Sequence, residues 1–382
     1  MARLTKSDLV ASLRHAAVRW HEIDVPGGGC VVAMQRGARL IGLFPENGPN
    51  AVNALWTNDR FDDILRGAVR DWEGKGVGGP GGERLWVSPE RRYYYRDPGN
   101  FADWFCPVAM DPGLYEPYDD PDAEVAWRNT FELSDMMNGR TYPGVTISRR
   151  FRPLENPYGN EAVLAQTLSR LRYAGVRKID SIELPGAPPD TQINLWTLAL
   201  IDPLPPKGVG TVVIPVRRGA EPVDYFGGLT GERLVVRDDH VTFRLDGRSI
   251  GKLGIRPEDI DPDRSAKVAA FLPAPDPDRL LLVLQRSSDV PRRQAECLDV
   301  AKVDPAGPKG VLQAYNHGPG DDRRKRYPKF GEIEIQLAAA RPEGKGLSAR
   351  AISDLLAFEG PRDDVIAFGT AILDIRELHT FA

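Results

Sequence analysis

Apolar and polar residues alternate one by one along residues 329–337, which read Lys-Phe-Gly-Glu-Ile-Glu-Ile-Gln-Leu. A period of two residues is typical of a β-strand with one buried face. The apolar residues share one face, and the polar residues Glu332, Glu334 and Gln336 share the other. Two carboxylates and an amide on one face favour the floor of a cleft for a polyhydroxylated ligand. A solvated edge strand is the alternative, and the pattern alone leaves both open.

Short apolar or alternating runs, separated by turn residues, recur along the chain. The 38 glycines and 33 prolines punctuate these runs, which favours many short strands over long helices. Residues 194–200 are almost all apolar, which is typical of a central strand covered on both faces. Strands are predicted at residues 29–35, 38–44, 126–133, 144–153, 162–173, 178–183, 192–201, 209–217, 233–236, 241–245, 268–272, 280–285, 310–315 and 330–337. Residues 164–171 also fit a helix. The pattern predicts an all-β fold, a large antiparallel β-sandwich.

Helical signals are few. Ser7 is a candidate N-cap for a helix that extends to about Trp20, and a second short helix is predicted over residues 59–69. Residues 348–358 and 374–379 fit either a helix or a strand. Since no repeat or biased linker interrupts the chain, we expect one domain over residues 1–382, with residues 1–22 as a helical extension.

Composition narrows the function classes. Hydrophobic residues make up 41% and charged residues 27%, with a net charge of −4, which is ordinary for a globular protein and does not favour a nucleic-acid partner. The chain has no apolar run of 18 residues and no signal-peptide pattern, so we expect no membrane partner and a cytoplasmic location. If a signal was removed, a periplasmic or secreted location is expected instead.

We expect no cofactor and no metal. The three cysteines, Cys30, Cys106 and Cys297, lack the spacing of a zinc site and are interpreted as buried thiols. The acidic stretches at residues 119–122 and 321–322 could offer oxygen ligands to Ca²⁺, but they lack EF-hand spacing and fit solvated turns better.

Arg84 and Trp86 lie two residues apart on a strand that follows a glycine-rich turn. A guanidinium fork beside an aromatic platform suits a sugar or a uronate, because the fork binds a carboxylate and the ring stacks on a pyranose. The alternative is a buried arginine that neutralises Glu90 next to a core tryptophan. The aromatic stretch 93–118, with Tyr94 and Trp104, fits a lid or a subsite wall, or a loop packed over a sheet edge.

Five segments resemble, in order, signatures of a branch of the galactose mutarotase-like superfamily whose function is unknown. The segments are residues 81–90 (Gly-Gly-Glu-Arg-Leu-Trp-Val-Ser-Pro-Glu), 194–200 (Asn-Leu-Trp-Thr-Leu-Ala-Leu), 224–227 (Asp-Tyr-Phe-Gly), 251–255 (Gly-Lys-Leu-Gly-Ile) and 315–316 with 330–336 (Tyr-Asn, then Phe-Gly-Glu-Ile-Glu-Ile-Gln). The resemblance covers about residues 25–370. It implies a β-supersandwich whose concave face binds sugar.

In the aldose 1-epimerases of this superfamily, a Glu-x-Gln strand supplies a general base, so the resemblance assigns that role to Glu334, with Gln336 beside it. The chain lacks their Asn-His-x-x-Phe-Asn acid motif. Lys252 and His317 are the candidate acids in its place, since either could donate a proton if its pKa is suitable. Trp196 and Asn316 lie in matching segments and are candidate sugar contacts.

The expected function is therefore a carbohydrate-active enzyme that transfers a proton on a sugar or uronate, as an epimerase, isomerase or lyase. The alternative is a non-catalytic carbohydrate-binding protein that uses the same cleft. The expected partner is a small mono- or oligosaccharide, and the sequence does not determine the oligomeric state.

Overall fold

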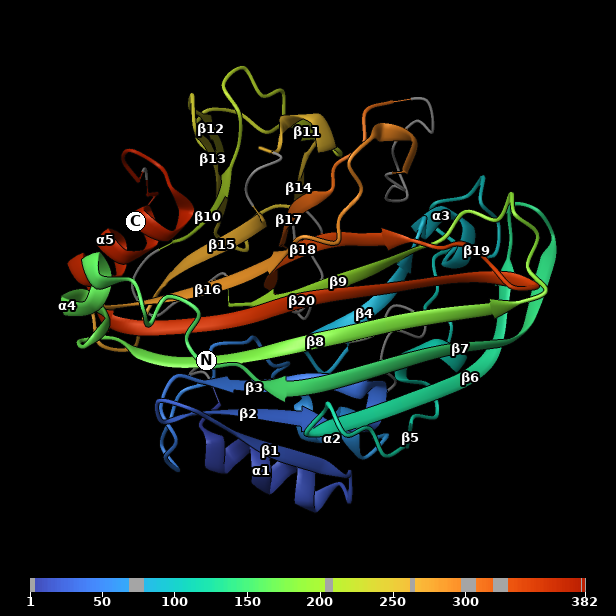
Figure 1. Cartoon of the computed structure of the whole chain (residues 1–382), viewed down its shortest axis with the longest axis horizontal. Helices are drawn as coiled ribbons and strands as arrows, with labels where there is room; N and C mark the ends of the chain where they lie inside the picture. The colour runs from blue at the N-terminus through green and yellow to red at the C-terminus, as the bar shows by residue number, and fades with distance from the viewer. Residues whose placement is uncertain are drawn as a thin grey trace.

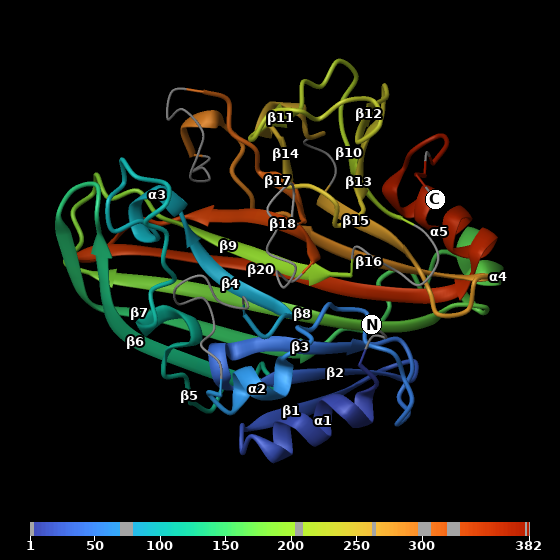
Figure 2. The ribbon, with the colours of Figure 1, turned by 180° about the vertical axis from the view of Figure 1, so that it is seen from behind.

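Two large antiparallel sheets form the protein in the computed structural model (Figures 1 and 2). The model describes residues 4–68, 79–202, 209–261, 265–296, 307–318, 329–378 and 380–381. The predicted all-β sandwich is thus confirmed. The prediction of one domain over residues 1–382 stays a prediction.

The first sheet has nine strands, and the polar strand identified from its alternation lies in its middle. In spatial order these are β1 (Trp20–Val25), β2 (Gly29–Met34), β3 (Arg39–Phe44), β4 (Glu83–Ser88), β9 (Asn194–Ile201), β18 (Phe330–Ala339), β17 (Leu312–His317), β14 (Gly251–Ile255) and β11 (Val223–Asp224). Because β18 pairs with β9 on one side and β17 on the other, the solvated edge strand considered above is wrong.

The second sheet has eleven strands, and its long members cross the whole molecule in Figure 1. In spatial order these are β12 (Leu234–Val236), β13 (His240–Leu245), β10 (Gly210–Pro215), β15 (Ala266–Pro273), β16 (Arg279–Ser287), β20 (Gly346–Pro361), β8 (Arg172–Pro185), β7 (Arg140–Pro153), β6 (Val125–Asp135) and β5 (Glu116–Pro117), while β19 (Arg341–Glu343) pairs with β20. The stretch 348–358, for which helix and strand were both open, is part of β20.

The main apolar core lies between the sheets. Apolar side chains of β15, β16 and β20 in one sheet are buried in the same cluster as those of β9, β17 and β18 in the other. Strand β9 is buried at every position, which confirms the interpretation of residues 194–200 as a central strand. A smaller cluster joins the first helix to β2 and β3.

Helices cover the ends and one edge of the sandwich. The α-helices are α1 (Lys6–His15), α2 (Phe61–Leu65), α3 (Glu90–Tyr93), α4 (Ala165–Leu168) and α5 (Arg362–Leu373), with 3₁₀ turns at Arg36–Ala38, Ala162–Leu164, Pro257–Asp259 and Gln294–Glu296 and a π turn at Ala109–Gly113. In Figure 1, α1 lies against β1–β3, while α4 and α5 lie at the opposite end of the long strands from β19. None of the helices in the described part of the chain is long and apolar enough to cross a membrane.

Several predicted boundaries are wrong. The first helix ends at His15 rather than near Trp20, and Ala17 adopts a positive φ of 53° before Trp20 begins β1. Residues 162–168 form a 3₁₀ turn and α4 rather than a strand, which agrees with the alternative that residues 164–171 fit a helix, while residues 172–173 already belong to β8. Helix α5 was not predicted, and it ends at Leu373, just before the stretch 374–379 that was expected to be helix or strand.

Helix α1 begins at a capping box, and the cap is Thr5 rather than the predicted Ser7. The Thr5 hydroxyl accepts from the Asp8 amide, and the Asp8 carboxylate accepts from the Thr5 amide, each at 3.2 Å. We expect Thr5→Ala to lower the free energy of unfolding by about 1 kcal/mol, because one helix N–H loses its partner. Urea unfolding measures the change. Ser7→Ala is the control, and an equal loss in both variants would contradict the assignment of the cap.

Candidate functional site

Five neighbouring strands place most of the predicted site residues on one face of the nine-stranded sheet. Opposite residues of paired strands share a face, and the register pairs Trp86 with Trp196 and Trp196 with Gln336. The same register carries Arg84 on β4 and Glu334 on β18 to that face. Lys252 of β14 reaches it through its pairing with Tyr315 of β17, which pairs in turn with Glu332.

Glu334 and Lys252 form a buried ion pair at the centre of this face. The Lys252 ammonium Nζ lies 2.9 and 2.7 Å from the two carboxylate oxygens, and the Trp196 indole Nε1 donates to Oε2 at 3.1 Å. Glu334 is 0% exposed and Lys252 is 5% exposed, so both members of the pair are buried. The ammonium also lies 4.9 Å from the centroid of the Trp196 ring.

Burial raises the pKa of Glu334 to about 7, and the nearby Glu332 carboxylate adds to the shift, while Lys252 and Arg84 oppose it. Desolvation disfavours the charged carboxylate more than the two cations favour it. A carboxyl group that titrates near neutral pH can accept and return a proton under ordinary conditions. The Lys252 ammonium lies in direct contact with the carboxylate that would carry this proton.

A second ion pair lies beside the first. Arg84 Nη2 donates to Glu332 Oε1 at 2.8 Å, and the guanidinium carbon lies 4.1 Å from the centroid of the Trp86 ring. Arg84 and Trp86 are therefore in contact with each other, and their role in binding a sugar stays a prediction. Glu90, the alternative partner of Arg84, instead accepts a hydrogen bond from Trp104 Nε1 at 2.9 Å.

The aromatic stretch after β4 packs on Trp86. The Tyr94 and Trp104 rings lie 4.9 and 6.3 Å from the Trp86 ring, which in turn lies 5.9 Å from Trp196. Trp86 Nε1 also donates to Asp111 Oδ2 at 2.7 Å. The stretch therefore lies against the site, as a wall or a lid of this face would.

Asp111, Arg39 and Ser88 were not predicted. Arg39 Nη2 donates to Asp111 Oδ2 at 2.5 Å, and Ser88 Oγ donates to Gln336 Oε1 at 2.5 Å. Burial would raise the pKa of Asp111, but Arg39 and Trp86 lower it below its usual value. Asp111 lies in an irregular loop and Arg39 at the start of a strand, so no local periodicity indicates that they meet.

The described contacts of His317 are with Tyr315 and Phe330. Its Nδ1 lies 2.7 Å from the Tyr315 hydroxyl, and its ring stacks on Phe330 with centroids 4.7 Å apart. Burial lowers the pKa of His317 to about 4, although Glu332 opposes the shift. The imidazole is therefore neutral at physiological pH and carries no extra proton to donate.

Asn316 is buried and holds a neighbouring turn. Its Oδ1 accepts from the amides of Asp246 and Gly247, both at 3.0 Å, and its Nδ2 donates to the Ser249 carbonyl at 2.6 Å. It lies between Tyr315 and His317 on β17 and so points to the opposite face of the sheet. These bonds give Asn316 a structural role, which is to hold the turn at residues 246–249. The predicted contact of Asn316 with a sugar has no geometric support.

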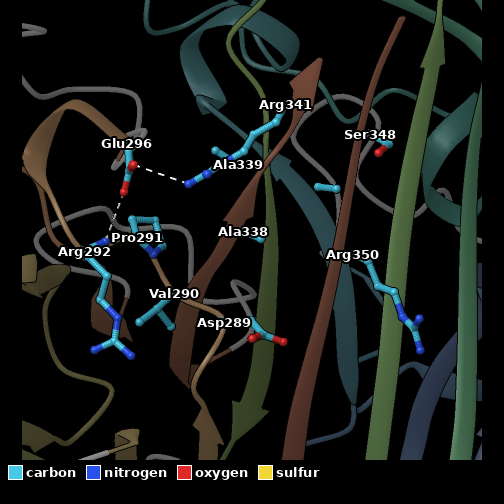
Figure 3. A pocket seen from close by; sticks show the side chains of 11 residues that line it. Asp289, Val290, Pro291, Arg292, Glu296, Ala338, Ala339, Arg341, Ser348 and Arg350 are labelled. Carbon is cyan, nitrogen blue, oxygen red and sulfur yellow. Dashed lines mark hydrogen bonds and ion pairs between the residues drawn. The ribbon is translucent and has the colours of Figure 1, made fainter. Parts of the chain in front are cut away.

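The side chains at the centre of this face are nearly closed to solvent, whereas Tyr315, His317 and Trp104 at its border are half-buried. A separate cavity of about 370 Å³ lies at the far end of β18, where Glu296 meets Arg341 and the Arg292 backbone (Figure 3). Its lining includes none of the predicted site residues. Arg350 lies across this cavity and points away from Glu296 in Figure 3.

The described part of the chain contains no group of three or more His, Cys, Asp or Glu side chains that could hold a metal ion. In the acidic stretch 119–122, Asp120 pairs with Arg150 at 3.1 Å. Cys30 and Cys106 are buried thiols, as predicted. Cys297 and the stretch 321–322 lie outside the described residues.

Solved structures share this fold at low sequence identity. A Klebsiella pneumoniae protein assigned as an aldose 1-epimerase is 12% identical, with a TM-score of 0.51, over 93% of this chain and 84% of its own. Galactose 1-epimerase from Lactobacillus acidophilus is 11% identical, with a TM-score of 0.48, over 90% of this chain and 95% of its own. The first of these similarities confirms, for the fold, the resemblance to the galactose mutarotase-like superfamily.

Comparison by sequence identifies one family. No curated protein matches the chain significantly. One family profile matches residues 64–377, which is well over half of the chain and includes the strands that carry Arg84, Trp196, Lys252 and Glu334. The chain therefore belongs to the family of unknown function DUF6786.

Proposed function

We propose that this protein is a carbohydrate-active enzyme that transfers a proton on a sugar or uronate at the face formed by β4, β9, β18, β17 and β14. Glu334 acts as the general base and Lys252 as its acid partner. The observation that carries the proposal is the buried Glu334 carboxylate, held by Lys252 at 2.7 and 2.9 Å with a pKa raised to about 7. A general base is most effective when its pKa lies near the working pH.

The residues around the pair suit a sugar ring. The centroids of the Trp86 and Trp196 rings lie 5.9 Å apart, and the Arg84 guanidinium lies over the first of them. A uronate carboxylate could share the Arg84 guanidinium with Glu332, since a guanidinium has five N–H donors. Such neutralisation favours removal of the proton next to the carboxylate, so epimerisation, isomerisation and β-elimination all fit the site. The fold shared with the Klebsiella protein agrees with this proposal.

Non-catalytic carbohydrate binding is the second candidate, and one observation favours it. Both carboxylates already have cationic partners, Glu334 with Lys252 and Glu332 with Arg84. Such mutually neutralised pairs can line a binding surface without any proton transfer. Binding without turnover would support this candidate.

The test is proton exchange and anomer interconversion by NMR, across monosaccharides, uronates and short oligosaccharides. We expect Glu334→Gln to lower turnover by at least about 100-fold, because the amide cannot accept the proton. Glu132→Gln, which changes an exposed carboxylate on β6, is the control and should keep full turnover. Ligand-induced shifts in both wild type and Glu334→Gln, without turnover in either, would contradict catalysis and leave the binding protein.

A further inference from the structure

Four charged side chains are buried between the two sheets, on the opposite side of the nine-stranded sheet from the proposed site. They are Glu83 of β4, Arg149 of β7, and Lys178 and Asp180 of β8, each 0% exposed or nearly so. Two are cations and two are anions, so the group is formally neutral. We call these four residues, together with Thr197 and Gln285, the inter-sheet network.

Lys178 is the centre of this network and uses all three of its donors. Its Nζ lies 3.0 Å from Glu83 Oε1, 2.7 Å from Thr197 Oγ1 and 2.8 Å from Gln285 Oε1. The Gln285 amide then donates to the backbone carbonyl of Ile333 at 2.7 Å. The chain of bonds therefore joins β8 and β16 of one sheet to β4, β9 and β18 of the other.

Arg149 extends the network to the start of β3. Its Nε donates to Asp180 at 2.8 Å, its Nη2 donates to Glu83 at 2.9 Å, and its Nη1 donates to the Ala38 carbonyl at 2.8 Å. Ala38 precedes Arg39, whose guanidinium holds Asp111 against Trp86. By binding the Ala38 carbonyl, the network therefore also fixes the backbone next to Arg39, which holds Asp111 against Trp86.

The contacts of the network with β4, β9 and β18 each fall directly next to a proposed site residue. Glu83 precedes Arg84, Thr197 follows Trp196, and the Ile333 carbonyl lies between Glu332 and Glu334. Because successive strand residues point to opposite faces, a bond that fixes one residue from behind fixes the direction of its neighbour in front. Three separate strands show the same juxtaposition.

Stability alone is a weak reason for such a network. Replacing a buried ion pair with apolar residues of similar volume is often neutral or stabilising, and in some proteins buried charges are retained because they hold a specific arrangement. Here the arrangement is the relative position of β4, β9 and β18. These are the strands whose front face carries Arg84, Trp196 and Glu334.

We propose that the inter-sheet network positions the residues of the proposed site. Through Gln285 and Thr197 it fixes the positions of β18 and β9 relative to the eleven-stranded sheet. The position of β18 in turn fixes the contact between Glu334 and Lys252. Gln285 and Thr197 are positioning residues, since neither lies on the front face of the sheet. This inference rests on the proposed function only in treating that face as a site. The geometry of the Glu334–Lys252 pair can be measured without any sugar.

The experiment is an NMR titration of the Glu334 carboxyl carbon in ¹³C-labelled protein, with its signal assigned by its absence from Glu334→Gln. Gln285→Met keeps the side-chain length but removes the donor to the Ile333 carbonyl. We expect the Glu334 midpoint to rise by about one pH unit, because β18 can then move from Lys252 while the carboxylate stays desolvated. Thr197→Val, nearly isosteric, tests the link to β9 and should raise the midpoint in the same direction.

Ser287→Ala is the matched control. Ser287 lies two residues from Gln285 on β16, and its hydroxyl donates to the Ile352 carbonyl of β20 at 2.6 Å, so its loss leaves the nine-stranded sheet untouched. Its Glu334 midpoint should equal that of wild type. An unchanged midpoint in both network variants, or an equal shift in the control, would overturn the inference. A shift in the network variants supports it even if no sugar is turned over, in which case only the proposed function fails.

Discussion

Replacing Arg149 with methionine should lower the free energy of unfolding by about 3–5 kcal/mol, the usual cost of breaking a buried ion pair from one side. Arg149 is fully buried and bonds Asp180, Glu83 and the Ala38 carbonyl. Among the described residues it is the only hydrogen-bond donor to the Asp180 side chain. Methionine would fill much of the space but leave that carboxylate and the carbonyl without a donor between the sheets.

The adjacent arginine provides a sharp control for this measurement. Arg150 points to the opposite face of β7, where its guanidinium pairs with Asp120 and both side chains retain contact with water, at 18% and 13% exposed. Arg150→Met should therefore cost about 1 kcal/mol or less. Urea or guanidinium unfolding of the two variants compares the same substitution at neighbouring positions. Similar losses would refute the special role of the buried arginine.

Replacing Lys252 with methionine should destabilise the protein by up to about 3 kcal/mol more at pH 9 than at pH 5. The Glu334 carboxylate would lose its nearest cation and keep only Arg84, while Glu332 still repels its charge. At pH 5 the buried carboxyl is protonated and needs no cation. At pH 9 the Glu334 carboxyl must either keep its proton at a pH that favours ionisation or carry a buried negative charge without the Lys252 cation.

The sign follows from proton linkage. The pKa of Glu334 is raised to about 7 in the folded protein, above its value in the unfolded chain. The free energy of unfolding of wild type therefore falls, through this group, as the pH rises towards 7 and does not fall further above that pH. Removing Lys252 raises the folded pKa further, and the loss therefore continues above pH 7, by up to about 1.4 kcal/mol per pH unit. Unfolding curves of variant and wild type between pH 5 and 9 measure the difference.

The double variant Lys252→Met with Glu334→Gln is the control for this pH dependence. It removes both charges, so the difference in stability from wild type should no longer grow between pH 7 and 9. A single variant whose stability follows that of wild type at every pH would show that the Lys252–Glu334 contact is not an ion pair in solution.

The period-two pattern predicted the strands best where one face is polar. Alternation identified β18, and an unbroken apolar run identified β9, because these patterns are set by the two faces of a single strand. The same logic failed at residues 162–168, where apolar and small residues form short helical turns at the end of the sandwich. There α4 packs against α5, and the local pattern fitted a helix as well as a strand, so it did not decide between them.

The candidate site was predicted where a motif carried the residue and missed where only the fold brings residues together. Lys252 and Glu334 are 82 residues apart, and only the register of β14, β17 and β18 places them in contact. Arg149 and Arg150 show the limit most clearly, since these identical neighbours point to opposite faces of β7, with side chains 0% and 18% exposed. Nothing in the sequence around them indicates which arginine points between the sheets.

The family match begins at residue 64, after β1, β2 and β3, yet these strands complete the sheet that carries the proposed site. A protein shortened to the matched residues would lose the Ala38 carbonyl and Arg39. It would also lose the pairing of Leu40 with Glu83 and leave β4 at the edge of the sheet. Such an edge is a template for pairing with another chain. If a protein shortened to residues 64–377 aggregates, the exposed edge of β4 would therefore explain the aggregation. The solubility of the full chain could not be judged from it.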